Sequence, residues 1–159
     1  NVELIRAMPT TSSRFNKGIT ASLNISSTLS TYNKAKKMFN KVGMVIELKK
    51  EQEMDTFTGL IGSGPAYFFY LLKAYEKRLI KLCNNDSALT AKAMSGLLEG
   101  VALSLEDGSS IDDLIKKVAS KKGTTEAGLK SFKKNKLLSS FDKGISAAVN
   151  RSKEIANES

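Results

Sequence analysis

A run of apolar residues, Ala66 to Leu72 (Ala-Tyr-Phe-Phe-Tyr-Leu-Leu), most constrains what this chain can fold into. Pro65 precedes the run and suits the first turn of a helix, where the missing N–H of proline costs nothing. The predicted helix extends to about Leu82, and its first turns are apolar on every side. A helix that is apolar all round is buried all round. In a chain of 159 residues, this predicts burial against a partner subunit as well as against the chain's own core.

The chain is predicted to be mainly helical from Asp55 onward. Apolar residues recur at helical spacing, and the further helices are expected over residues 87–106, 111–119, from 124, and 139–156. Ser110 and Asp113 form a start for the second of these that resembles a capping box. Residues 84–86, Asn-Asn-Asp, are a turn and cap between the first two helices.

The first 50 residues are expected to fold differently. Short segments with strand composition occupy residues 2–7, 19–25 and 44–48, and a helix is predicted over 27–41. Three short strands do not make a self-sufficient sheet. We therefore expect them to be the edge of a larger sheet whose other strands are not in this chain.

Composition excludes several classes of function. The chain has no histidine, which removes Ser-His-Asp catalysis and histidine-based metal sites, and no metal site is expected. The single cysteine, Cys83, excludes an internal disulfide and fits a reducing cytoplasm. No stretch approaches the roughly 20 apolar residues of a membrane span, so no membrane partner is expected. The net charge is +9, but the lysines are scattered and few aromatic residues accompany them, so nucleic-acid binding is not favoured.

A glycine-rich segment, residues 62–67 (Gly-Ser-Gly-Pro-Ala-Tyr), resembles a dinucleotide fingerprint at first sight. Tyr67 stands where the third glycine would allow close packing of helix and strand. We therefore expect no cofactor-binding residues here, and interpret the segment as a tight turn that needs small side chains.

A second segment, residues 120–125 (Ser-Lys-Lys-Gly-Thr-Thr), joins two predicted helices. A helix N-terminus offers unpaired N–H groups and partial positive charge, Gly123 permits close backbone approach, and Ser120, Thr124 and Thr125 supply hydroxyls. These features suit a carboxylate or phosphate. An ordinary threonine N-cap with two solvated lysines explains the same residues, and physical reasoning alone leaves both interpretations open.

Three other features have structural interpretations. Asp55 with Thr58 is interpreted as a helix cap, and Cys83 as the end of a buried helix. The acidic pairs Glu51 with Glu53 and Asp112 with Asp113 lie where helix starts favour carboxylates.

The order of several blocks closely resembles the pyrroline-5-carboxylate reductase family. These blocks are residues 6–9 (Arg-Ala-Met-Pro) with 18–20 (Gly-Ile-Thr), 54–67 (Met-Asp-Thr-Phe-Thr-Gly-Leu-Ile-Gly-Ser-Gly-Pro-Ala-Tyr), 123–129 (Gly-Thr-Thr-Glu-Ala-Gly-Leu) and 147–152 (Ala-Ala-Val-Asn-Arg-Ser). The block from Met54 to Tyr67 is the most specific of them.

The resemblance implies a fold and a domain division. It covers the family's carboxy-terminal part, a helical dimerisation domain of the 6-phosphogluconate dehydrogenase C-terminal type. Residues 1–50 would then be the last strands and a helix of the family's Rossmann domain, and residues 51–159 the dimerisation and substrate-loop domain. We expect the rest of the Rossmann domain to be absent from this chain.

The resemblance also implies an activity. Members reduce pyrroline-5-carboxylate to proline with NADPH or NADH, as interlocked homodimers in the cytoplasm. Ser120, Gly123, Thr124 and Thr125 would hold the substrate carboxylate, and Thr125 would be the catalytic residue that hydrogen-bonds the ring nitrogen. This chain alone is expected to bind no cofactor and to be inactive, so whether it is an enzyme is left open.

The chain departs from the family pattern at several positions. Lys121 and Lys122 replace Pro-Gly in the substrate loop, Thr10 replaces an asparagine, Ile61 replaces a serine, and residues 108–111 lack a His-Pro-like turn. Together these departures bear on substrate geometry more than on the fold. The change to Lys121 and Lys122, with the missing cofactor half, favours an alternative, a non-catalytic degenerate dimerisation module.

Overall fold

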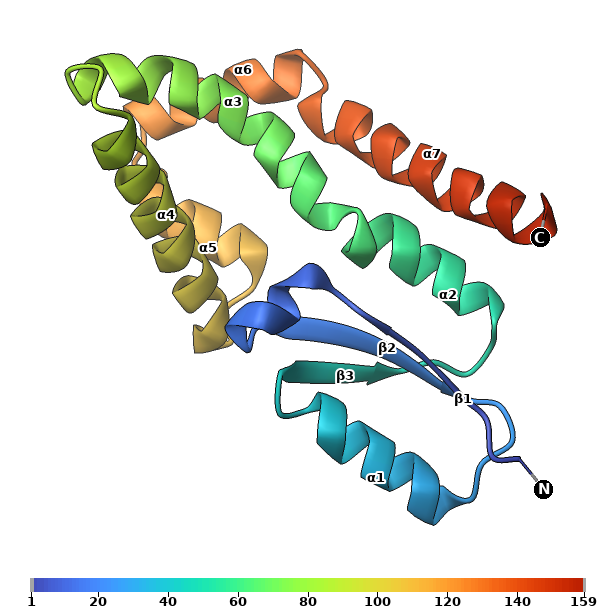
Figure 1. Ribbon diagram of the computed structural model, residues 1–159. Coiled ribbons are helices and arrows are strands. Elements are labelled where there is room, and N and C mark those ends of the chain that lie inside the picture. Colours follow the sequence, from blue (N-terminus) through green and yellow to red (C-terminus); the bar gives the residue numbers. More distant parts are fainter. Residues whose placement is uncertain (1, 159) are drawn as a thin grey trace. The chain divides into compact units, whose positions relative to one another are not determined.

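The computed structural model describes residues 2–158, and Figure 1 shows a small sheet followed by a series of helices. The elements, in chain order, are β1 (Ile5–Pro9), the 3₁₀ segment η1 (Thr11–Phe15), β2 (Gly18–Asn24), α1 (Leu29–Phe39), β3 (Gly43–Glu47), α2 (Gln52–Phe57), the π-helical segment η2 (Thr58–Gly62), α3 (Gly64–Leu82), α4 (Ser87–Ser104), the 3₁₀ segment η3 (Leu105–Asp107), α5 (Ile111–Val118), α6 (Thr124–Lys134) and α7 (Leu137–Glu158). The chain is therefore mainly α with a short β/α segment at its start, as predicted.

The three strands form one sheet in the order β1-β2-β3. β1 and β2 are antiparallel, with Ala7 opposite Ser22, whereas β2 and β3 are parallel, with Thr20 opposite Val45. A parallel pair needs a crossover connection, and α1 supplies it between β2 and β3. Within the described chain, the outer edges of β1 and β3 pair with no other strand.

Helices lie on both sides of this sheet, with α1 on one side and α2 on the other (Figure 1). Side chains alternate between the two faces of a strand. Ala21 of β2 packs with Met54 and Phe57 of α2 in the buried core. From α1, the buried Tyr32 donates a hydrogen bond from its hydroxyl to the carbonyl oxygen of Ser22, at 3.1 Å. The sequence did not predict α2 as a separate helix covering this face.

The chain divides into two compact units, and each is described by itself. The first comprises Asn1–Pro65 and Lys143–Ser159, and the second Ala66–Asp142. This is a division by packing. The predicted domain boundary after residue 50 separates the part that resembles the Rossmann domain from the part that resembles the dimerisation domain, and it stays a prediction.

The second unit buries very little of itself. Among its residues only Cys83 and Thr90 are buried, and α5, α6 and α7 contain no buried residue in the described chain. Phe69 is 67% exposed and Tyr70 is 74% exposed, although both belong to the apolar start of α3. The second unit therefore lacks a core of its own in the isolated chain.

The helix starts show why the sequence folds locally as it does. The side chain of Asp86 accepts a hydrogen bond from the N–H of Leu89 and caps α4. Ser110 caps α5 by accepting from the N–H of Asp113 and donating to its carboxylate. Each cap satisfies a donor that a helix N-terminus otherwise leaves unpaired, and both lie where the sequence predicted them.

The helix α4 with η3, residues 87–107, is long and apolar enough to cross a membrane by length and composition alone. The sequence-based expectation that no such segment exists was wrong, because it considered only uninterrupted apolar runs. Lys92 and Glu99 interrupt the run without making the helix polar on average.

Candidate functional site: a helix-start turn beside an apolar pocket

The predicted site residues come together in one tight turn between α5 and α6. The N–H of Gly123 donates to the carbonyl oxygen of Ser120 at 2.9 Å. A Cβ at Gly123 would lie 2.3 Å from Ser120 Oγ and 3.0 Å from the Ser120 carbonyl oxygen. A side chain at this position would therefore require Ser120 to move. Gly123 is the N-cap of α6, and Thr124 and Thr125 are its first two helical residues.

The start of α6 keeps unpaired donors. Gly123 offers no side chain to cap the helix, and the N–H groups of Thr124 and Thr125 have no acceptor within residues 2–158. Such donors, with the partial positive charge of a helix N-terminus, favour an anion. The turn therefore has the chemistry of a carboxylate or phosphate site.

Lys122, which precedes Gly123, has an unusual backbone conformation. Its φ is +61°, in the left-handed region that favours glycine. Its N–H donates to the Glu126 carboxylate, and Lys130 Nζ lies 2.7 Å from the other oxygen of that carboxylate. The Lys130 ammonium, and secondly the Lys122 N–H, hold the pKa of Glu126 below its usual range.

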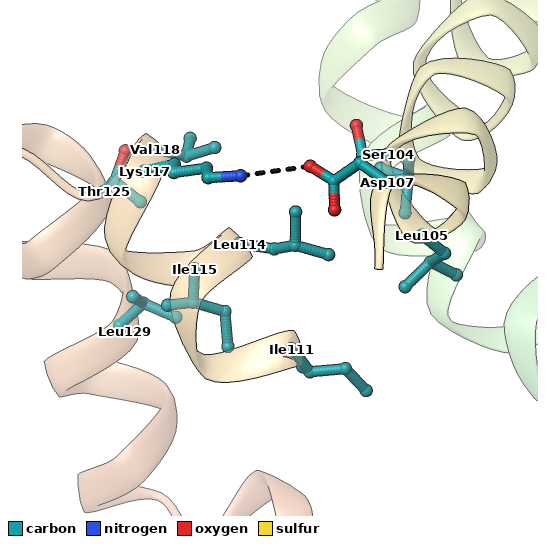
Figure 2. A pocket seen from close by; sticks show the side chains of 11 residues that line it. Ser104, Leu105, Asp107, Ile111, Leu114, Ile115, Lys117, Val118, Thr125 and Leu129 are labelled. Atoms are coloured by element: carbon teal, nitrogen blue, oxygen red, sulfur yellow. Dashed lines mark hydrogen bonds and ion pairs between the residues drawn. The ribbon is translucent and has the colours of Figure 1, made fainter. Parts of the chain in front are cut away.

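Beside the turn lies an apolar pocket of about 440 Å³. Its lining residues come from α4, η3, α5 and α6: Val101, Ser104, Leu105, Asp107, Ile111, Leu114, Ile115, Lys117, Val118, Thr125 and Leu129. Figure 2 shows Thr125 near Val118 and Lys117 at one end of α5, with Ile111 at the other. Thr125 is thus the predicted site residue that borders both the turn and the pocket.

Asp107 and Lys117 form the polar part of the pocket wall. Lys117 Nζ lies 3.0 Å from Asp107 Oδ2 and 2.8 Å from Ser109 Oγ, and Figure 2 shows the ion pair as a dashed line. The N–H of Ser109 donates to Asp107 Oδ1 at 2.7 Å. This N–H, followed by the Ser109 hydroxyl and Lys117, lowers the pKa of Asp107 from 3.8 to about 2. The carboxylate is therefore ionised at neutral pH.

Sequence reasoning missed the pocket, although a pattern for it was present. Ile111, Leu114, Ile115 and Val118 recur at i, i+3, i+4 and i+7 and give α5 one apolar face. The pairing of Asp107 with Lys117 spans ten residues and depends on the turn between η3 and α5, so spacing alone does not reveal it.

Two residues of the most specific block of the sequence contact α7 and β1 within the first unit. Asp55 lies inside α2 and accepts a hydrogen bond from the Ser152 hydroxyl of α7 at 2.8 Å. Thr58 donates to the Met54 carbonyl oxygen, at 2.8 Å, and contacts the sulfur of Met8. The interpretation of Asp55 with Thr58 as a helix cap was wrong, because the helix begins before Asp55.

The glycine-rich segment, residues 62–67, runs from the end of η2 into the start of α3 and does not follow a strand. A dinucleotide fingerprint needs the turn from a strand into a helix. The residues therefore do not fit a cofactor pyrophosphate. Within residues 2–158, no group of three or more acidic or cysteine side chains is arranged to hold a metal ion.

A family model described as pyrroline-5-carboxylate reductase dimerisation matches residues 51–155. The chain belongs to the pyrroline-5-carboxylate reductase family. Residues 51–155 are its dimerisation region, so the unburied helices α3 and α4 lie in the part of the family named for dimer formation.

Relatives from several bacteria match nearly the whole chain. Pyrroline-5-carboxylate reductase 1 of Bacillus spizizenii is 32% identical over 156 residues, which is 98% of this chain and 52% of the relative. The Pseudomonas aeruginosa pyrroline-5-carboxylate reductase is 29% identical over 98% of this chain and 57% of its own length. The chain therefore spans about half the length of the curated relatives it matches.

Solved structures of the family share the fold. A pyrroline-5-carboxylate reductase from Coxiella burnetii superposes with a TM-score of 0.82 at 31% identity, covering 96% of this chain and 57% of that chain. The Plasmodium falciparum enzyme, whose structure has NADP bound, gives a TM-score of 0.82 at 26% identity over 96% of this chain and 58% of that one.

Proposed function

We propose that this chain is the dimerisation and substrate-binding part of a pyrroline-5-carboxylate reductase, which reduces pyrroline-5-carboxylate to proline with NADPH or NADH. The observation that carries the proposal is the turn at the start of α6. It combines the family's threonine pair with unpaired N–H groups that suit a carboxylate.

In this proposal each residue of the turn has a role. The N–H groups of Thr124 and Thr125 bind the substrate carboxylate, Gly123 leaves room for it, and the Ser120 hydroxyl borders it. The Thr125 hydroxyl hydrogen-bonds the ring nitrogen, where charge changes as the C=N bond is reduced. The apolar pocket beside Thr125 supplies a surface of low polarity near the ring.

The nicotinamide cofactor supplies the hydride in the proposed reaction. Because residues 62–67 do not fit a pyrophosphate, we assign no residue of this chain to the cofactor. We expect no NADPH oxidation when the chain alone is given pyrroline-5-carboxylate and NADPH.

A second copy of the chain is the proposed partner, through interlocked helices. The support is the second unit, which buries only Cys83 and Thr90 and exposes most of the apolar start of α3. Large apolar surfaces of this kind mark interfaces with partners. We place the protein in the cytoplasm, since its one cysteine is unpaired and buried.

The alternative, a non-catalytic dimerisation module, has specific support. Thr10 replaces the family's asparagine, and its hydroxyl already makes hydrogen bonds within the chain. The hydroxyl oxygen accepts from the N–H of Ile19 and lies 2.9 Å from Ser12 Oγ. Lys122 stands where the family has glycine. The two functions differ in whether the turn binds the product, proline.

The deciding experiment is an NMR titration with L-proline. We expect the amide signals of Thr124 and Thr125 to shift, and Thr125→Ala to weaken binding by about tenfold, as for one lost hydrogen bond to a charged or polar ligand. Thr56→Ala is the matched control, because Thr56 is an exposed helical threonine outside the turn. A chain whose amides do not respond to proline would support the non-catalytic alternative.

A further inference from the structure

We propose that Glu126 is a positioning residue, which holds the turn at residues 120–125 in the conformation that binds the carboxylate. The inference rests on the proposed function of that turn. It assigns to Glu126 a role that neither touches the substrate nor supplies chemistry to it.

The first step concerns Lys122. An L-residue with a side chain adopts a φ of +61° only when its surroundings hold it there. The sole contact that the described chain makes with the Lys122 N–H is the hydrogen bond to the Glu126 carboxylate. Glu126 therefore stabilises a backbone conformation that lysine by itself disfavours.

The second step concerns what the Lys122 backbone controls. Gly123 follows it, and its N–H closes the turn onto the Ser120 carbonyl oxygen at 2.9 Å. Any rotation at Lys122 moves Gly123 and therefore disturbs the hydrogen bond that closes the turn. The directions of the Thr124 and Thr125 N–H groups are therefore set by the conformation that Glu126 holds.

The third step concerns how Glu126 is held. It is the third residue of α6, where a carboxylate reaches back toward the residues before the helix. Here it accepts a hydrogen bond from the N–H of Lys122, one residue before the N-cap Gly123, and the N–H groups of Thr124 and Thr125 have no acceptor within residues 2–158. Lys130, one helical turn later, fixes the carboxylate from the other side at 2.7 Å.

A rescue experiment separates positioning from a general electrostatic effect. Glycine adopts a positive φ without steric cost, so Lys122→Gly removes the need for Glu126. We expect Glu126→Ala to weaken L-proline binding by about tenfold, the fold-change of one lost charge-assisted hydrogen bond. We expect the double variant Glu126→Ala with Lys122→Gly to bind within about threefold of the parent chain. Glu126→Gln, which keeps an acceptor oxygen, should fall between the two.

Lys121→Gly is the matched control. It removes the same charge from the same turn at a residue whose φ is not positive, so it should not rescue Glu126→Ala. Rescue by both glycines would show that lost charge, and not backbone conformation, is what matters, and would overturn the proposal. Unchanged binding by Glu126→Ala would overturn it as well.

The same titration distinguishes this proposal from the proposed function. If the parent chain binds L-proline but Glu126→Ala binds equally well, only the positioning role fails. If the parent chain shows no response at Thr124 and Thr125, the proposed function fails, and the role of Glu126 toward a substrate fails with it.

Discussion

Replacing Gly59 with alanine tests how α7 is attached to the family's most specific block. Gly59 is buried in η2. A Cβ built there would lie 2.6 Å from Cγ2 and 2.6 Å from the backbone nitrogen of Val149, and 2.8 Å from Val149 Cα. Carbon atoms in contact are normally about 3.5–4.0 Å apart, so α7 would have to move by roughly 1 Å. Because two of the three atoms are backbone, a change of side-chain rotamer does not relieve the overlap.

The expected loss follows from two opposing effects. Overpacking of this kind costs about 1–3 kcal/mol, whereas replacing a helical glycine with alanine gains about 1 kcal/mol. Because two of the overlapped atoms are backbone, the upper part of that cost applies, about 2–3 kcal/mol, and we expect Gly59→Ala to lower the free energy of unfolding by about 1–2 kcal/mol. The displacement of α7 would also lengthen the hydrogen bond between Asp55 and Ser152, which is 2.8 Å in the native chain.

Urea unfolding followed by circular dichroism measures this effect, at one protein concentration because a dimer's stability depends on it. Gly144→Ala is the matched control: it lies in α7, no atom lies within 4 Å of the position its Cβ would take, and it should stabilise by about 0.5–1 kcal/mol. The reasoning is refuted if Gly59→Ala unfolds at the same or a higher urea concentration than the parent.

Two further predictions concern the interface and the pocket. Phe69→Glu places a charge on the exposed start of α3 and should weaken the proposed dimer by at least tenfold, since burial of a large apolar side chain contributes about 1.5–3 kcal/mol. Light scattering across a dilution series measures this, and Lys77→Glu is the control that should leave the association unchanged. The pKa of Asp107 is lowered from 3.8 to about 2, so its contribution to stability is present above pH 3.8 and is lost as the pH falls through about 2. In Lys117→Met, a carboxyl NMR titration should show that the pKa of Asp107 rises but stays below 3.8, because the hydrogen bond from the Ser109 N–H is the largest cause of the lowered pKa. A return of the pKa to 3.8 would contradict this.

The sequence predicted most helices because their starts and ends depend on neighbouring residues. At Asp86 and at Ser110, the capping side chain accepts from the N–H three residues later. This short spacing can be recognised in the sequence, so it predicts where the helix begins. The helix α2 and the π-helical η2 were not foreseen as separate elements. Their sequence mixes threonines and glycines with apolar residues, and the close approach of Gly59 to Val149, ninety residues later, is a tertiary contact that local sequence does not reveal.

The candidate site was predicted in its residues but not in its support. Ser120, Gly123, Thr124 and Thr125 were named as a possible anion site from their hydroxyls, the glycine and the helix start, and the resemblance then favoured that interpretation; their role in substrate binding stays a prediction. The positive φ of Lys122 could not be predicted from the residue type, because lysine has no preference for that conformation. The family's glycine at that position was nevertheless a sign, since glycine commonly stands where the backbone needs a positive φ.

The apolar surface of α4 admits two environments, a lipid bilayer or protein, and the charges on the helix decide between them. Lys92 and Glu99 lie within residues 87–107, and a charged side chain near the centre of a span costs about 2.5–3.5 kcal/mol. At the end of the segment, Asp107 is held ionised by Ser109 and Lys117. A protein partner can leave such charges at the rim of an interface and in contact with water. A protein partner therefore accounts for this surface better than lipid does, and the second copy of the chain that we propose would also bury the apolar start of α3.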